Sequence, residues 1–413
     1  MDAKLLEARL RFAAGALSLV VLVPRFLAAP SERQPSQFTG PGARGESIAD
    51  MVVHDMCGKR VALLGESPTH GFAKTLELKV EIARRLVNEC GYNAFFIESG
   101  AYDFLNIQKS FESKKPVTES MIAAAIGGLW ANKEVEPLVP FLLEKAQRGA
   151  LVLGGLDDQL GRGTYAQQQM PADLAALLDG DDRARCLAIL QKHTLWQYTN
   201  DAPYGPKDKA LILGCLDQIE SSLSAPGKSG HVYERAMVEN LKRYFARDLR
   251  DAVGPAADVE TESFNGRDRS MSMNFAWLMS RLPARSKVIV WTATIHAAKS
   301  LTGVPGREKF VPLGSYIRRE FKSESFVLGI SAFSGSYAMG RQAPRPLSAA
   351  PPSSFENFAF AENQSDSRYF NRAQIGELGS RPARLLGSDF RTANWSDVFD
   401  GLVVFREEHP PHL

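Results

Sequence analysis

The chain is predicted to be an α/β protein with a mainly parallel central sheet flanked by helices, because short apolar runs alternate with amphipathic segments. The first apolar run, 61–64, precedes apolar residues at helical spacing from residue 73 onward, and a second run follows at 94–97. Two more apolar runs lie at 150–154 and 288–291. A strand, a helix and a strand in this order form a right-handed unit with parallel strands.

A helical insertion is predicted between the third and fourth strands. Apolar residues recur at helical spacing through 160–285, and clusters of Gly, Pro and Asp interrupt them. We expect this insertion to form a lid over an α/β catalytic domain whose two parts are 47–159 and 286–408.

The N-terminal 29 residues read as a separate segment. Residues 12–23 are apolar or small, which is the size of a signal-peptide core and too short for a confident transmembrane helix. We therefore predict a signal peptide or membrane-anchor segment at 1–29, and a Pro-, Ser- and Gly-rich linker at 30–46. The protein is expected to be exported to the periplasm, with no stable membrane partner after cleavage. If the segment is an upstream start-site extension or an interfacial helix, the protein is expected to be cytoplasmic.

The composition is that of a soluble globular protein, with 44% hydrophobic and 23% charged residues among 413. The formal net charge of +2 gives no electrostatic reason to expect nucleic acid as a partner. The cysteines Cys57, Cys90, Cys186 and Cys215 are isolated in the sequence and lack metal-ligand spacing. We expect burial to be the main role of Cys90 and Cys215.

Acids and histidines follow the predicted strands, where an open α/β sheet binds its ligands. The residues expected at this edge are Glu66, His70, Glu98, Asp157 and His296. We expect Glu98 to lie beside His70, because their strands belong to one strand–helix–strand unit. A carboxylate and an imidazole at one edge can activate a water molecule or hold a metal ion.

Several motifs are missing from the sequence, and their absence narrows the chemistry. There is no Gly-x-Ser-x-Gly nucleophile elbow, no HExxH zinc helix and no Walker A loop. A serine mechanism of the usual α/β-hydrolase type is therefore not expected. For a hydrolase, direct attack by an activated water molecule remains.

The chain resembles the erythromycin esterase family over roughly residues 47–408. The blocks that carry the resemblance are LLGESPTHG at 63–71, AFFIES at 94–99, LWANKEVEPLVPFL at 129–142, LGGLDDQ at 153–159, RDRSMSMNFAWLM at 267–279 and VIVWTATIHAA at 288–298. The resemblance implies a hydrolase that opens a carboxylic ester or lactone without a serine nucleophile, and it raises antibiotic resistance as a possible role.

Two departures from the family pattern bear on the substrate. The family turn reads Gly-Glu-x-Thr-His-Gly, whereas Ser67-Pro68 here separates Glu66 from the Thr-His pair by one additional residue. The family segment Trp-Ala-His-Asn-Ala-His keeps only its second histidine, His296, because Ala293 and Thr294 replace the first histidine and the asparagine. Cleavage of macrolides by this chain does not follow from the resemblance.

We assign provisional roles to the candidate residues. His70 would take a proton from water, Glu98 or Glu66 would hold its other ring nitrogen, and Arg267 would meet the developing oxyanion. His296 is a further catalytic candidate and could bind the substrate carbonyl. The expected substrate-binding residues are Trp130, Asn132, Glu134, Asp157 and Asn274. The expected partner is a small ester or lactone, and no cofactor is expected.

Two alternatives remain open from the sequence. A divalent metal ion could be held by Glu66, His70, Glu98 and His296, which would make the protein a metal-dependent hydrolase. A non-catalytic protein of the same fold could instead bind a metal or a haem-like ligand through His70 and His296. Chelator sensitivity distinguishes the first alternative, and a ligand absorbance band without turnover distinguishes the second.

Overall fold

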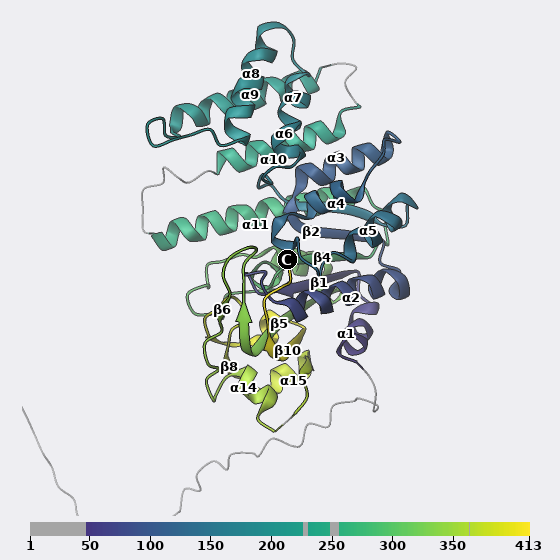
Figure 1. The fold of residues 1–413 in the computed structure, drawn as a ribbon, viewed down its shortest axis with the longest axis vertical. Helices are drawn as coiled ribbons and strands as arrows, with labels where there is room; N and C mark the ends of the chain where they lie inside the picture. The colour runs from purple at the N-terminus through teal and green to yellow at the C-terminus, as the bar shows by residue number, and fades with distance from the viewer. Residues whose placement is uncertain (1–46, 226–229, 248–255, 363) are drawn as a thin grey trace, which may run out of the picture. The chain divides into compact units, whose positions relative to one another are not determined.

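The computed structural model describes residues 47–413 except 226–229, 248–255 and 363 (Figure 1). The predicted leader and linker lie outside the described residues. Within the described part of the chain, no helix is long and apolar enough to cross a membrane.

A mainly parallel sheet forms the centre of the fold, as predicted. Among the described residues it has eight strands, in the order β3-β2-β4-β1-β5-β10-β7, with β6 paired to β5. All pairs from β3 to β10 are parallel, whereas β7 and β6 are antiparallel to their neighbours. The strands are β1 (Val61–Glu66), β2 (Ala94–Gly100), β3 (Val152–Asp157), β4 (Val288–Ala293), β5 (Ser325–Tyr337), β6 (Arg345–Pro346), β7 (Ser367–Asn371) and β10 (Gly401–Glu408). A separate hairpin pairs β8 (Ser380–Ala383) with β9 (Arg391–Asn394).

Helices cover both faces of the sheet. Those before the insertion are α1 (Ile48–Cys57), α2 (Ala73–Cys90), α3 (Ala101–Glu112), α4 (Glu119–Ile126), the short 3-10 helix η1 (Gly128–Trp130) and α5 (Leu138–Gln147). Those after β4 are α12 (Thr294–Ala297), α13 (Leu313–Phe321), η2 (Lys322–Glu324), α14 (Phe355–Phe360), α15 (Arg372–Glu377) and α16 (Trp395–Val398).

The alternation of side chains along β1 divides the core between the two faces. Ala62 and Leu64 join the core cluster that contains α1, α2 and α5, whereas Val61 and Leu63 join the cluster that contains α13 and part of α11. Successive residues of a strand point to opposite faces, so a strand that is apolar throughout is buried on both sides.

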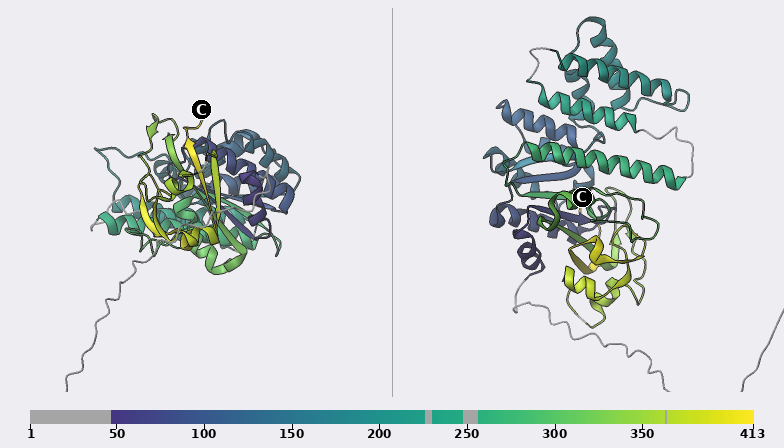
Figure 2. Two further views of the ribbon diagram at one scale, coloured as in Figure 1. Left: turned by 90° about the horizontal axis from the view of Figure 1, so that it is seen from below. Right: turned by 180° about the vertical axis from the view of Figure 1, so that it is seen from behind.

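The segment between β3 and β4 is helical, and it builds a core of its own. Its helices are α6 (Tyr165–Gln168), α7 (Met170–Ala175), α8 (Gly180–Thr194), α9 (Pro206–Leu223), α10 (Val232–Ala246) and α11 (Ala256–Ser280). Buried residues of α6 to α10 pack together with residues of α3, while α11 packs on β3 (Figures 1 and 2). The helical bundle thus joins the sheet at its β3 end.

One expectation about the strand order is wrong. β1 and β2 were expected to be neighbours, but β4 lies between them and pairs with both: Val288 is in register with Val61 on one side and with Ala94 on the other. The two parallel strands of a strand–helix–strand unit can be adjacent or can have another strand between them. The choice depends on pairing with a strand that lies far away in the sequence.

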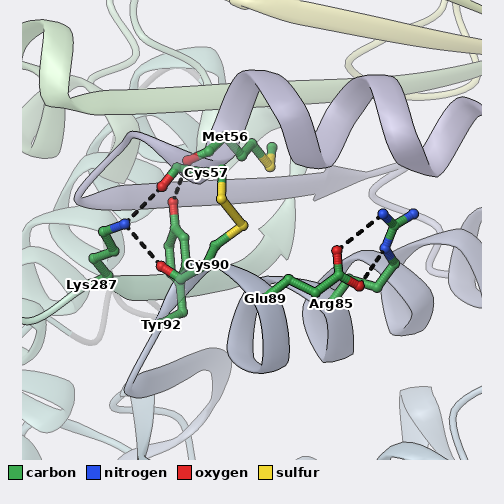
Figure 3. The surroundings of a disulfide bond; sticks show 7 residues. All are labelled: Met56, Cys57, Arg85, Glu89, Cys90, Tyr92 and Lys287. Atoms are coloured by element: carbon green, nitrogen blue, oxygen red, sulfur yellow. Dashed lines mark hydrogen bonds and ion pairs between the residues drawn. A yellow bond between two sulfur atoms is a disulfide. The ribbon is translucent and has the colours of Figure 1, made fainter.

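The four cysteines form two disulfides, which the sequence interpretation did not anticipate. Cys57 at the end of α1 is bonded to Cys90 at the end of α2, and Cys186 of α8 is bonded to Cys215 of α9. Lys287 reinforces the first junction by donating to the carbonyls of both Cys57 (2.7 Å) and Cys90 (2.9 Å) (Figure 3). Spacing in sequence does not reveal such pairs, because each joins the ends or faces of two packed helices.

Glu408, at the end of β10, caps the helix that follows the His70 turn. Its carboxylate accepts from the amides of Lys74 (3.0 Å) and Thr75 (2.8 Å) and from the Thr75 hydroxyl (2.6 Å). These amides at the start of α2 have no partner within the helix, so β10 satisfies them. Burial raises the pKa of Glu408 to about 7, although the hydrogen bonds oppose this shift.

Substitution of Glu408 by Gln should alter how stability depends on pH. A carboxyl whose pKa is about 7 in the fold and about 4.5 when exposed binds its proton more tightly in the folded state. Its stabilising contribution is therefore complete below pH 4.5 and is lost as the pH rises through 7. Between these values, the wild type should lose about 3 kcal/mol of unfolding free energy relative to Glu408→Gln. Urea denaturation of both proteins at the two pH values measures this, and a constant difference would contradict it.

Candidate active site

The turn after β1 presents His70 through an uncommon backbone conformation. The His70 amide donates to the Ser67 carbonyl at 2.8 Å, which closes a turn that accommodates Ser67-Pro68. His70 has a φ of 51°, in the left-handed region that few non-glycine residues adopt. The following Gly71 lies against Ala338, whose carbonyl oxygen would be 2.5 Å from a Cβ at position 71. A side chain at position 71 would therefore clash with the neighbouring backbone.

Glu66 lies behind His70 and fixes the orientation of its ring. Nδ1 of His70 is 3.0 Å from Oε1 of Glu66, and Nε1 of Trp130 donates to the same oxygen at 2.8 Å. The Trp130 ring meets the His70 ring edge-on, with 5.0 Å between the centroids. Glu66 is only 1% exposed, so the longer turn leaves it inside the protein. Because Nδ1 faces Glu66, Nε2 is the nitrogen that remains for a ligand.

A buried lysine compensates the charge of Glu66. Nζ of Lys79 lies 3.3 Å from Oε1 of Glu66 and 4.0 Å from the centre of the Trp291 ring. Burial lowers the pKa of Lys79 to about 8, against the opposing effect of Glu66. Burial also disfavours the Glu66 carboxylate, but Lys79 and His70 outweigh this effect and lower the pKa of Glu66. Glu66 is thus ionised near neutral pH and can accept the Nδ1 proton of His70.

A second polar cluster is centred on Arg267 of α11. Its Nη2 donates to Glu98 at 2.8 Å and to Asp157 at 2.6 Å, and its Nε donates to Asp157 at 3.0 Å. The other oxygen of Glu98 accepts from the Thr292 hydroxyl (2.6 Å) and the Ala293 amide (2.8 Å). Residues of β2 and β3 therefore bind the guanidinium group directly, and the end of β4 supports it through Glu98.

His296 extends this cluster to a buried aspartate. Its Nε2 is 2.9 Å from Nη1 of Arg267 and 3.3 Å from Glu98, while its Nδ1 is 2.8 Å from Asp268. Phe264 stacks on the ring at 5.0 Å. Burial disfavours the imidazolium, but Asp268 and Glu98 outweigh it and raise the pKa of His296. Burial also opposes ionisation of Glu98, but His296 and Arg267 lower its pKa.

Both clusters border one pocket of about 470 Å³. The predicted site residues that line it are His70, Glu98, Trp130, Asp157, Arg267 and His296. Its other lining residues include four glycines and several apolar side chains, namely Gly100, Gly127, Gly128, Gly161, Ile126, Leu129, Leu160 and Met339. An ionised guanidinium, two histidines and an apolar rim thus meet in one cavity of a size typical for small ligands.

Three predicted substrate-binding residues lie outside this lining. Asn132 accepts from the Val135 amide at 3.0 Å. Glu134 binds His412, with 2.6 Å between a carboxylate oxygen and Nδ1. Asn274 donates to the backbone of β3 at 2.8 Å. Each of these polar side chains forms hydrogen bonds within the protein. The sequence pattern does not distinguish such a role from ligand binding.

The expected pairing of His70 with Glu98 is wrong. β4 separates their strands, and the carboxylate in contact with the His70 ring is that of Glu66. Glu98 instead binds Arg267. The alternative partner, Glu66, is therefore the one that fits the geometry.

Sequence reasoning missed two residues beneath the pocket, Lys79 and Asp268. Lys79 is fully buried on the apolar face of α2 beside Leu76 and Ala83. A lysine within an apolar stripe of a helix could have indicated a buried ion pair, since buried lysines are almost always paired. Asp268 directly follows Arg267 in a block that the family resemblance had already marked.

Replacing Lys79 by Met should destabilise the fold by about 3–5 kcal/mol, because it leaves the buried Glu66 carboxylate without its compensating ammonium. The double variant Lys79→Met/Glu66→Gln should recover much of this loss, since it removes both charges. Urea denaturation of the single and double variants measures the effect. Lys133→Met is the matched control, because that lysine is 65% exposed in its pair with Glu136. A double variant no more stable than Lys79→Met would contradict the pairing.

The chain is similar to several proteins of known sequence or structure. The Bacillus subtilis (strain 168) protein named "Putative hydrolase YbfO" is 24% identical over 319 residues, which cover 72% of this chain and 70% of that protein. A succinoglycan biosynthesis protein has a similar structure, with a TM-score of 0.66 and 13% identity over 89% of this chain and 99% of its own. A variant of the erythromycin esterase EreC in its open conformation has a TM-score of 0.64 and 15% identity to this chain. The likeness covers 88% of this chain and 94% of that one. At these identities the two structural likenesses show the fold alone.

The erythromycin esterase family model matches residues 87–408. The match begins within α2, so it includes Glu98, Arg267 and His296 but not Glu66 and His70. It nevertheless spans most of the chain. The protein belongs to the erythromycin esterase family of hydrolases.

Proposed function

We propose that this protein hydrolyses a carboxylic ester or lactone with a water molecule that His70 activates. The observation that carries the proposal is the Glu66–His70 contact, which holds Nδ1 of the histidine and leaves Nε2 for the pocket. Nε2 takes a proton from water while the water oxygen attacks the substrate carbonyl. When the tetrahedral intermediate collapses, the same proton passes from Nε2 to the departing alkoxide.

Arg267 is the cation proposed to meet the negative charge that develops on the carbonyl oxygen. Burial opposes its charge, but Asp157 and Glu98 outweigh this and raise the pKa of Arg267, so that the guanidinium stays charged. Its fixed position matters, because charge stabilisation in an active site depends on donors that are oriented before the reaction.

A water nucleophile also agrees with the environment of the pocket serine. Ser99 lines the pocket, but its hydroxyl donates to the Ala125 carbonyl at 2.6 Å. A serine nucleophile would instead be expected to hydrogen-bond to the catalytic base. His70 therefore fits better as a base for water than as a base for Ser99.

The metal-dependent alternative fits these residues poorly. Glu98 and His296 both contact the guanidinium of Arg267, and Glu66 contacts the Lys79 ammonium. A divalent ion would have to displace these cations from their carboxylates. Among the described residues, no group of three or more His, Cys, Asp or Glu side chains could hold a metal ion. The haem-like alternative faces the same obstacle at Nε2 of His296.

We also propose export, on two grounds. The N-terminal segment has the size of a signal-peptide core, and the structure pairs all four cysteines, none of which is free. Disulfides persist in oxidising compartments such as the periplasm.

Protein from a periplasmic extract should therefore have no free thiol after denaturation and four free thiols after reduction. A thiol reagent counts them. Free thiols in protein isolated under alkylating conditions would argue against export. Cytoplasmic expression provides the comparison.

Replacing His70 by Ala should lower kcat/KM roughly a hundredfold to ten-thousandfold, the usual contribution of a general base. Glu66→Gln should cost nearly as much, and the double variant little more than His70→Ala, because residues that act as one unit are not additive. Single-turnover hydrolysis of macrolide lactones and aryl esters measures the rates. His54→Ala, an exposed histidine of α1, is the control and should be unchanged.

The same assay tests the alternatives. Rates should be insensitive to EDTA, and loss of activity that added divalent metal restores would favour the metal-dependent reading. Equal rates for the wild type and His70→Ala on every substrate would overturn the hydrolase mechanism. A visible ligand absorbance band in such an inactive protein would support the binding-protein alternative.

A further inference from the structure

The segment 408–413 contacts two parts of the chain, the start of α2 and residues 133–134. At one end, Glu408 caps α2, and the His409 carbonyl accepts from the Ala73 amide at 2.9 Å. At the other end, the His412 carbonyl accepts from the Lys133 amide at 2.7 Å. We call these six residues the 408–413 strap.

Glu134 is the main side-chain anchor of the strap. Its carboxylate accepts from the His412 amide at 3.1 Å and lies 2.6 Å from Nδ1 of the same residue. The Glu134 side chain is 2% exposed, whereas that of His412 is 68% exposed. A buried carboxylate needs partners, and the hydrogen bonds of Glu134 within the described chain all come from the strap.

One contact point lies close in sequence to the proposed base, and the other lies close to a residue that contacts the Glu66–His70 pair. Ala73 begins α2, three residues after His70. Glu134 lies four residues after Trp130. Nε1 of Trp130 donates a hydrogen bond to Glu66, and its ring makes an edge-on contact with the His70 ring. The strap therefore holds the two segments that define where Glu66 and His70 sit.

We propose that Glu134 and His412 are positioning residues, which fix residues 130–135 and thereby keep the Glu66–His70 pair aligned for catalysis. The proposal rests on the proposed function. Neither residue lines the pocket, so neither is expected to touch the substrate. Their effect should appear in kcat, because a displaced catalytic group slows the chemical step even when substrate binding is intact.

The test uses the full chain and a matched set of variants. His412→Ala removes the Nδ1 contact, whereas His412→Asn keeps a donor at nearly the same place. His54→Ala, at an exposed histidine of α1 outside the strap, is the control. On a small aryl ester, His412→Ala should lower kcat about tenfold with KM nearly unchanged. His412→Asn should restore most of the loss, and His54→Ala should behave as the wild type.

A double-mutant cycle identifies the route of the effect. If the strap acts through Trp130, His412→Ala should add little to the loss caused by Trp130→Phe, since coupled residues are not additive. Independent, multiplicative losses in the two variants would overturn the proposal, as would an unchanged kcat in both His412→Ala and Glu134→Ala.

A second readout separates this inference from the proposed function. Amide hydrogen exchange at residues 130–135 should accelerate in His412→Ala and return to the wild-type rate in His412→Asn, whether or not the protein hydrolyses any ester. Unaltered exchange would overturn the strap itself. If the wild type cleaves no ester while His412→Ala still shows the accelerated exchange, the hydrolase function alone is refuted.

Discussion

The site depends on one buried oxygen atom, Oε1 of Glu66. It is contacted by the His70 ring, the Trp130 indole and the Lys79 ammonium, which come from the turn after β1, from η1 and from α2. The ionised carboxylate is stable in the interior only because these groups compensate it. In return it fixes the His70 tautomer, the orientation of the Trp130 ring and the position of Lys79 above Trp291. The turn after β1, helix α2 and η1 are thus joined through a single acceptor.

The strand order explains why the pocket has two separate halves. β4 lies between β1 and β2, so the Glu66–His70 pair belongs to one side of β4 and the Glu98–Arg267 pair to the other. Thr292 and the Ala293 amide at the end of β4 bind Glu98 directly. The intervening strand therefore separates the base from the cation and allows each to keep its own carboxylate.

The sequence predicted what depends on local pattern and missed what depends on distant contacts. Apolar runs located four strands of the sheet, and acids and histidines after them located Glu66, His70, Glu98, Asp157 and His296. The position of β4, the two disulfides and the partner of His70 could not be read in this way, because each depends on segments that only the fold brings together. Asn132, Glu134 and Asn274 show the converse error. Their polar side chains lie near the strands that carry the site, but they already form hydrogen bonds with the backbone or with another side chain.

Arg267 accounts for the way in which three acids coexist beside the pocket. Glu98, Asp157 and Asp268 lie within one buried cluster, and such a cluster normally attracts a metal ion or a proton. Here the guanidinium bonds the first two, while His296 bonds the third. A planar group with five donors can satisfy several oxygens at fixed angles, whereas a lysine at the same place could not. The Arg267 guanidinium therefore keeps its positive charge beside the pocket, and that charge requires neither a bound ion nor a change of protonation at Arg267.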